Sequence, residues 1–144
     1  MKWLALAAVF SVCAFAQPPG VRTVYILSMP GGFDQYLANW LTAEHVLDVV
    51  TDPKAADAIL TDRLGEVFER KMAQILPREE DDEADASKPT FRSSVNQGTV
   101  FLVHAGSRKV LWSDYEKPSH VYSAAKLSDA ARKIVTKMQR AFPR

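Results

Sequence analysis

Cysteine is nearly absent from this 144-residue chain. The only one, Cys13, falls in an N-terminal stretch that we expect to be removed. The mature chain would then have no disulfide framework, no thiol nucleophile and no cysteine metal site. Its core must be stabilised by packing alone.

Glycine is also scarce, and no phosphate-binding loop is present in the sequence. The Pro30-Gly31-Gly32 run precedes an apolar helix pattern, where backbone N–H groups could meet an anion. No Lys-Ser/Thr pair or second glycine spacing follows, so the run predicts a turn with positive φ. Ser107 and Ser113 lack the Gly-x-Ser-x-Gly pattern of a serine nucleophile.

The three histidines, His45, His104 and His120, are far apart and lack ligand-type spacing. A metal site needs three or four convergent donors, so we expect no metal and no cofactor. Asp52, Asp57 and Asp62 are close in sequence, but they mark strand ends more readily than they form a paired acid and base.

Residues 1–16 have the pattern of a secretory signal peptide. Lys2 is followed by an uncharged, mostly apolar run, and Ala14-Phe15-Ala16 offers a small-x-small cleavage site. The run is too short for an anchoring helix, so we expect no transmembrane segment in the mature chain. The prediction is an exported protein, periplasmic or secreted.

Cys13 allows a competing interpretation, in which cleavage just before it produces a lipid anchor. That signal normally has a small residue before the cysteine and a leucine further upstream, whereas Phe10-Ser11-Val12 stands here. Cleavage after Ala16 is therefore favoured over lipidation.

Charge is balanced over the chain but uneven along it. Six acids gather between Glu79 and Asp85, inside a Ser-rich segment with few large apolar residues, so 78–97 is expected to be an exposed flexible loop. From Lys126 to Arg144 basic residues dominate. A solvated helix face explains this excess, and weak attraction to a polyanion or anionic lipid is the alternative.

Hydrophobic periodicity predicts the order β-α-β-β-α-β-β-α within one domain, residues 17–144. Strands are expected at 21–29, 46–50, 57–62, 98–106 and 108–115, the last two as an antiparallel hairpin, with amphipathic helices at 33–45 and 64–76 and a C-terminal helix capped by Ser128. The expected fold is a two-layer α/β sandwich: a mixed or mostly antiparallel sheet with helices packed on one face.

Several segments together resemble a small α/β domain of bacterial envelope proteins. These segments are Leu47-Asp48-Val49-Val50, Ala56-Asp57 followed by Ala58–Thr61, and the hairpin arm Val110-Leu111-Trp112-Ser113. That domain type occurs in the curli-export lipoprotein, in lipoprotein activators of penicillin-binding proteins and at the N-terminus of the Tol-system β-propeller protein. The helix at 64–76 and its acidic loop look like an insertion, and no pore-forming strand pair is present.

The resemblance implies a non-catalytic accessory protein that binds a protein or another envelope component during envelope assembly or maintenance. No nucleic-acid partner is expected. An alternative is a small exported hydrolase that uses Asp, His and Ser residues from loops, with a pocket in which His104 or His120 meets two carboxylates. A purely structural subunit with an exposed edge strand is a third possibility.

An aromatic and polar group on and after the hairpin is the candidate binding site. It consists of Trp112, Asp114, Tyr115 and Tyr122. If helices leave this side of the hairpin uncovered, the group forms an aromatic patch of the kind that binding surfaces use. The alternative is that Trp112 packs beneath the helices as core.

Overall fold

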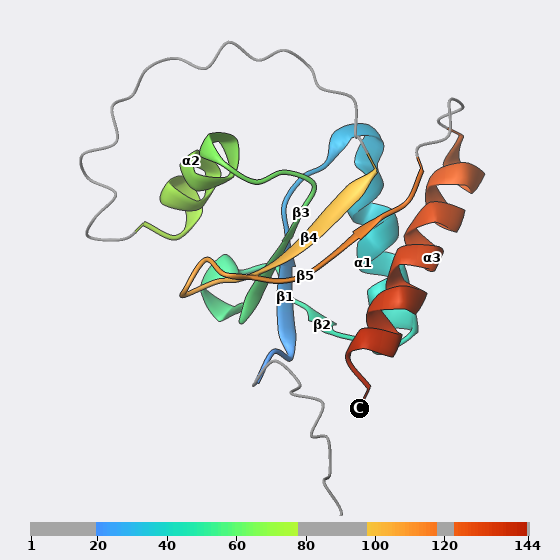
Figure 1. Ribbon diagram of the computed structural model, residues 1–144, viewed down its shortest axis with the longest axis horizontal. Coiled ribbons are helices and arrows are strands. Elements are labelled where there is room, and N and C mark those ends of the chain that lie inside the picture. The colour runs from blue at the N-terminus through green and yellow to red at the C-terminus, as the bar shows by residue number, and fades with distance from the viewer. Residues whose placement is uncertain (1–19, 78–97, 118–122, 144) are drawn as a thin grey trace, which may run out of the picture.

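A five-stranded sheet in the order β2-β1-β3-β4-β5 forms the centre of the computed structural model, which describes residues 20–77, 98–117 and 123–143 (Figure 1). The predicted signal peptide, the acidic loop at 78–97 and residues 118–122 lie outside these ranges. The strands are β1 (Thr23–Ile26), β2 (Asp48–Val49), β3 (Ala58–Thr61), β4 (Thr99–His104) and β5 (Val110–Tyr115). The helices are α1 (Phe33–Ala43), α2 (Glu66–Ile75) and α3 (Ala124–Ala141), with 3₁₀ turns at Pro30–Gly32 and Pro53–Ala55.

The sheet is mixed, as predicted. β1 pairs in parallel with β2 and β3, because the chain returns through α1 between β1 and β2 and through the segment with the Pro53–Ala55 turn between β2 and β3. β3, β4 and β5 pair antiparallel, with Leu60 opposite Leu102 and Leu102 opposite Trp112. The predicted hairpin is therefore β4–β5.

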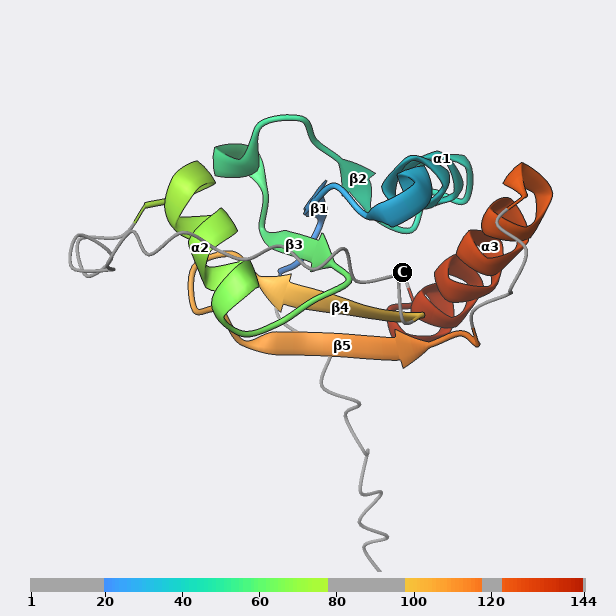
Figure 2. The same cartoon turned by 90° about the horizontal axis from the view of Figure 1, so that it is seen from above.

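The helices divide between the two faces of the sheet, which Figure 2 shows from above. α1 and α3 pack together on one face over a large cluster that includes Leu37, Leu60 and Ile134. α2 packs on the opposite face, where Phe68 and Met72 meet Ile59 and other sheet residues. The predicted α/β sandwich is confirmed, and the expectation of helices on one face holds for α1 and α3.

The placement of α2 explains the composition of β3. All four of its residues, Ala58–Thr61, are buried, without the alternation of a strand that has one solvated face. Ala58 and Leu60 belong to the α1–α3 side, and Ile59 belongs to the α2 side. A central strand covered on both faces has this pattern.

The start of α1 confirms the predicted turn. Gly31 and Gly32 both have φ of 70°, a conformation that glycine adopts without steric penalty. The buried carboxylate of Asp34 accepts a hydrogen bond from the Met29 backbone N–H at 3.0 Å. The N-terminal end of α1 thus already holds a negative charge from its own chain.

The predicted start of α3 is wrong by about one turn. The N-cap is Ser123, whose Oγ accepts a hydrogen bond from the Lys126 backbone N–H at 3.3 Å. Ser128 lies inside the helix, and its Oγ accepts a hydrogen bond from Trp40 Nε1 at 3.1 Å. The first three residues of the helix, Ala124–Lys126, include no large apolar side chain, so hydrophobic periodicity gives little sign of them.

Within the described ranges, no helix combines the length and apolar character needed to cross a bilayer.

Candidate binding surface

β5 is an edge strand, since its only partner among the described strands is β4. The Glu116 backbone N–H donates to the Gly98 carbonyl at 2.9 Å. Because N–H and C=O groups alternate in direction along an antiparallel strand, those of Tyr115 and Ser113 point away from β4 toward the open edge. A six-residue strand therefore presents backbone polar groups at this side of the sheet.

The exposed apolar side chains of the hairpin lie on the α2 side of the sheet. Tyr115 is 57% exposed and Val110 is 41% exposed. Val110 lies opposite Val103, which belongs to the cluster beneath α2, and Tyr115 lies opposite Thr99. Directly opposed residues share a face, so Val110 and Tyr115 flank the open edge on the α2 side.

Trp112 lies on the other face of the sheet. It is opposite Leu102 and packs, half-buried, against the large cluster between the sheet and α1 and α3. A bulge causes the change of face along the strand, because the register shifts between Leu102 and Val103 and leaves Leu111 without an opposing residue. Of the two alternatives for Trp112, packing against the core describes its position.

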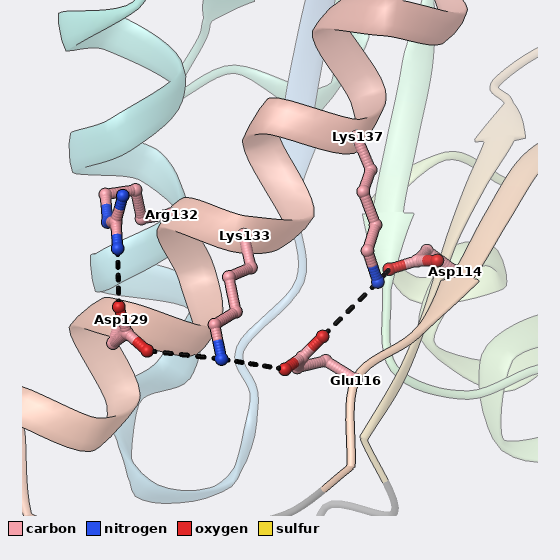
Figure 3. A network of polar contacts seen from close by, with 6 residues as sticks. All are labelled: Asp114, Glu116, Asp129, Arg132, Lys133 and Lys137. Atoms are coloured by element: carbon pink, nitrogen blue, oxygen red, sulfur yellow. Dashed lines mark hydrogen bonds and ion pairs between the residues drawn. The ribbon is translucent and has the colours of Figure 1, made fainter.

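Asp114 shares the face of Trp112 and belongs to an ionic network between β5 and α3 (Figure 3). Its Oδ2 lies 2.8 Å from Lys137 Nζ. The same ammonium lies 3.3 Å from Glu116 Oε2, and Lys133 Nζ lies 3.3 Å from Glu116 Oε1. Two carboxylates of the hairpin thus face two lysines one turn apart on α3.

The network continues along α3 through Asp129. Its two carboxylate oxygens contact Arg132 at 2.7 Å and Lys133 at 3.3 Å. The hydrogen bond from Arg132, followed by that from Lys133, lowers the pKa of Asp129. The hydrogen bonds of Lys133 to Glu116 and Asp129 raise the pKa of that lysine.

These contacts reduce the free positive charge of α3. Arg132, Lys133 and Lys137 all lie in ion pairs with acidic side chains. Lys126 and Arg140 are exposed and are the remaining basic residues of the helix. Ion pairs therefore engage three of the five basic residues of α3, and less of its charge is left to attract a polyanion.

His104 and the strand-end carboxylate Asp57 both make structural contacts. His104 Nδ1 accepts a hydrogen bond from the Ser107 backbone N–H at 3.0 Å in the hairpin turn. Asp57 Oδ2 accepts hydrogen bonds from the backbone N–H groups of Arg22 and Thr23. His120 lies outside the described residues, and within the described ranges no three His, Cys, Asp or Glu residues converge as a metal site.

The predicted binding group is thus divided. Trp112 and Asp114 face α3, Tyr115 faces the α2 side, and Tyr122 lies outside the described residues. Sequence reasoning missed Val110, Lys133 and Lys137. The sequence did contain a signal for the two lysines. Lys133 and Lys137 are four residues apart on a helix, and Asp114 and Glu116 are two residues apart on or just after a strand, so the two pairs are separated by similar lengths.

Searches of protein-family models, curated proteins and solved structures found no match to this chain. The resemblance to small envelope domains therefore stays a prediction.

Proposed function

We propose that this protein is an exported, non-catalytic accessory protein of the cell envelope that binds an extended segment of a partner protein at the open edge of β5. The observation that carries the proposal is the combination of outward-pointing backbone groups at Ser113 and Tyr115 with the exposed side chains of Val110 and Tyr115. A strand added there gains main-chain hydrogen bonds and covers two apolar side chains.

The surroundings of β5 favour a specific partner over indiscriminate pairing. Exposed Lys109 and Lys117 flank the strand, and the bulge at Leu111 interrupts its regular ladder. Flanking lysines and bulges are the devices by which native sheets limit edge-to-edge aggregation. A partner must therefore match a short stretch, Ser113–Tyr115, and we expect its binding to be transient rather than obligate.

Site-specific photocrosslinking in intact envelopes tests this proposal. A photoreactive phenylalanine analogue replaces Ser113 at the open edge, and in a matched control it replaces Gln139, which is exposed on α3. We expect a crosslinked partner protein from position 113 only. Equal crosslinking from both positions, or none from 113, would overturn the proposal, and a crosslink to a second copy would support the structural-subunit alternative.

A backbone variant separates edge pairing from side-chain contact. Ser113→Pro removes an N–H that points away from β4, whereas Ser113→Ala keeps it. We expect Ser113→Pro to abolish partner capture and Ser113→Ala to retain it. Circular dichroism of both variants verifies that the fold is retained, and capture by a folded Ser113→Pro variant would contradict strand addition.

Export has its own test. Mass spectrometry of the protein recovered from cells should find a mature N-terminus at Gln17. A lipid-modified Cys13 would show that the anchored alternative holds, and an intact Met1 in the envelope-free fraction would contradict export.

A further inference from the structure

A second, smaller apolar cluster lies beneath α2, on the face of the sheet opposite α1 and α3. Its buried members are Leu27, Ile59, Phe68, Met72 and Val103, and the half-buried Phe101 packs against them. Phe68 and Met72 are the only buried side chains that α2 contributes. α2 thus covers this face with two buried side chains and the half-buried Ile75, all from one short helix.

α2 has weak local support. It has ten residues, fewer than the roughly 12–15 below which an isolated helix is marginal in water. Its N-cap is Gly65, with no side-chain capping hydrogen bond. If α2 leaves the sheet, we therefore expect it to lose its helical structure in the same step.

Arg108 holds the C-terminal end of α2 to the hairpin turn. Its side chain is only 8% exposed, its Nη2 donates to the Leu76 carbonyl at 3.1 Å, and its Nη1 lies 3.5 Å from Glu69 Oε2. A guanidinium at a helix C-terminus is favoured by the helix dipole. Arg108 has φ of 60°, a backbone conformation that is costly for a residue with a side chain.

The covered face is continuous with the proposed binding surface. Val103, beneath α2, lies directly opposite the exposed Val110, and Phe101 lies opposite Ser113 of the open edge. We propose that α2 is a cover, fastened by Arg108, that opens while the rest of the fold stays intact and thereby extends the binding face of the hairpin from β5 onto β4. The claim that this opening extends the binding face rests on the proposed function.

Two native methionines measure the opening directly. Met72 on α2 and Met138 on α3 are both 0% exposed, so neither reacts with hydrogen peroxide without an opening of the structure. We expect Met72 of the full chain to oxidise at least about tenfold faster than Met138, because local openings need less free energy than global unfolding. Peptide mass spectrometry follows both residues in one sample. Equal oxidation rates of Met72 and Met138 would contradict a separate opening of α2. The proposed binding at the β5 edge would not be affected by that result.

The role of Arg108 is tested by Arg108→Gly, since glycine tolerates the positive φ while the guanidinium is lost. Lys109→Gly is the matched control, because it removes a neighbouring exposed charge. We expect Arg108→Gly alone to accelerate Met72 oxidation several-fold with Met138 unchanged. Unchanged Met72 oxidation would overturn the fastening role.

The link to binding is read from the crosslinking yield at position 113. If opening of α2 extends the binding face, Arg108→Gly raises this yield and Lys109→Gly does not. A faster Met72 oxidation with an unchanged yield would overturn the link while keeping the opening. Absence of any crosslink in all variants would instead count against the proposed function.

Discussion

Asp57 shows how a single residue can fix the start of two strands. Its Oδ2 accepts hydrogen bonds from the backbone N–H groups of Arg22 and Thr23, each at 2.9 Å, and its own N–H donates to Thr23 Oγ1 at 2.9 Å. These contacts join the residue before β3 to the start of β1. The prediction from sequence that Asp57 marks a strand end is confirmed.

The backbone hydrogen bonds from Arg22 and then Thr23 lower the pKa of Asp57 below its ordinary value of 3.8. A carboxylate whose folded pKa is depressed stabilises the fold above the unfolded pKa, and this stabilisation is lost as the pH falls through the folded pKa. We predict that Asp57→Ala lowers the free energy of unfolding at pH 7 by about 1–2 kcal/mol, the range for a partly exposed charged hydrogen bond.

Asp57→Asn is the matched variant, because its amide oxygen can keep both hydrogen bonds without the charge. We expect a smaller loss at pH 7 and a weaker dependence of stability on pH below 3.8 than in the wild type. Urea denaturation of the three proteins between pH 2 and pH 7 measures both effects. An identical pH dependence in Asp57→Asn and wild type would contradict the assignment.

At the scale of elements, periodicity predicted the five strands and three helices of the described residues, because each falls on an apolar stripe or run in the sequence. What it missed depends on tertiary contacts. The stripe of α2 shows that the helix is amphipathic but not which face of the sheet it covers. The bulge at Leu111 changes the face of Trp112 relative to Val110, and an alternating pattern carries no sign of it.

The candidate site was less predictable than the fold for the same reason. Sequence grouped Trp112, Asp114 and Tyr115 by proximity, and the pleat of β5 placed them on two faces. Asp114 acquires its partner, Lys137, from a helix 23 residues further along the chain. The matching spacings of the acids on β5 and the lysines on α3 predict this contact only if β5 and α3 are already known to be neighbours.

The contact between β5 and α3 leads to a prediction for Lys137. The hydrogen bond to Asp114 raises the pKa of this lysine, opposed by burial and supported by Glu116. Its stabilising effect is therefore present below the ordinary pKa of 10.5 and is lost as the pH rises through the higher folded pKa. Because the pair is partly exposed, we expect Lys137→Met to cost no more than about 1 kcal/mol.

A double-mutant cycle with Asp114→Asn isolates the pair, and Lys126→Met, on an exposed part of α3, is the control. We expect a coupling energy of a few tenths to about 1 kcal/mol at low salt, which shrinks in 1 M salt as screening increases. Urea denaturation at both ionic strengths supplies the values. A coupling energy that salt does not change would contradict an ionic origin.

At the scale of the whole molecule, the two faces of the sheet contribute unequally to stability. The face under α1 and α3 contains the large cluster and most of the fully buried side chains, whereas five buried residues form the cluster on the α2 face. Hydrophobic stabilisation scales with the apolar area removed from water. The α1–α3 face should therefore set the global stability, and the α2 face is available for local change.

Met138 and Met72 test this inequality, because the same side chain is fully buried on each face. We predict that Met138→Ala lowers the free energy of unfolding by about 2–5 kcal/mol, the usual cost of truncating a buried methionine. Met72→Ala should cost less than half as much, because the loss cannot exceed the free energy with which α2 docks on the sheet. Urea denaturation followed by tryptophan fluorescence measures both, since Trp40 and Trp112 pack against the large cluster. Equal losses in the two variants would mean that both faces unfold as one cooperative unit, and α2 could then not move separately from the sheet it covers.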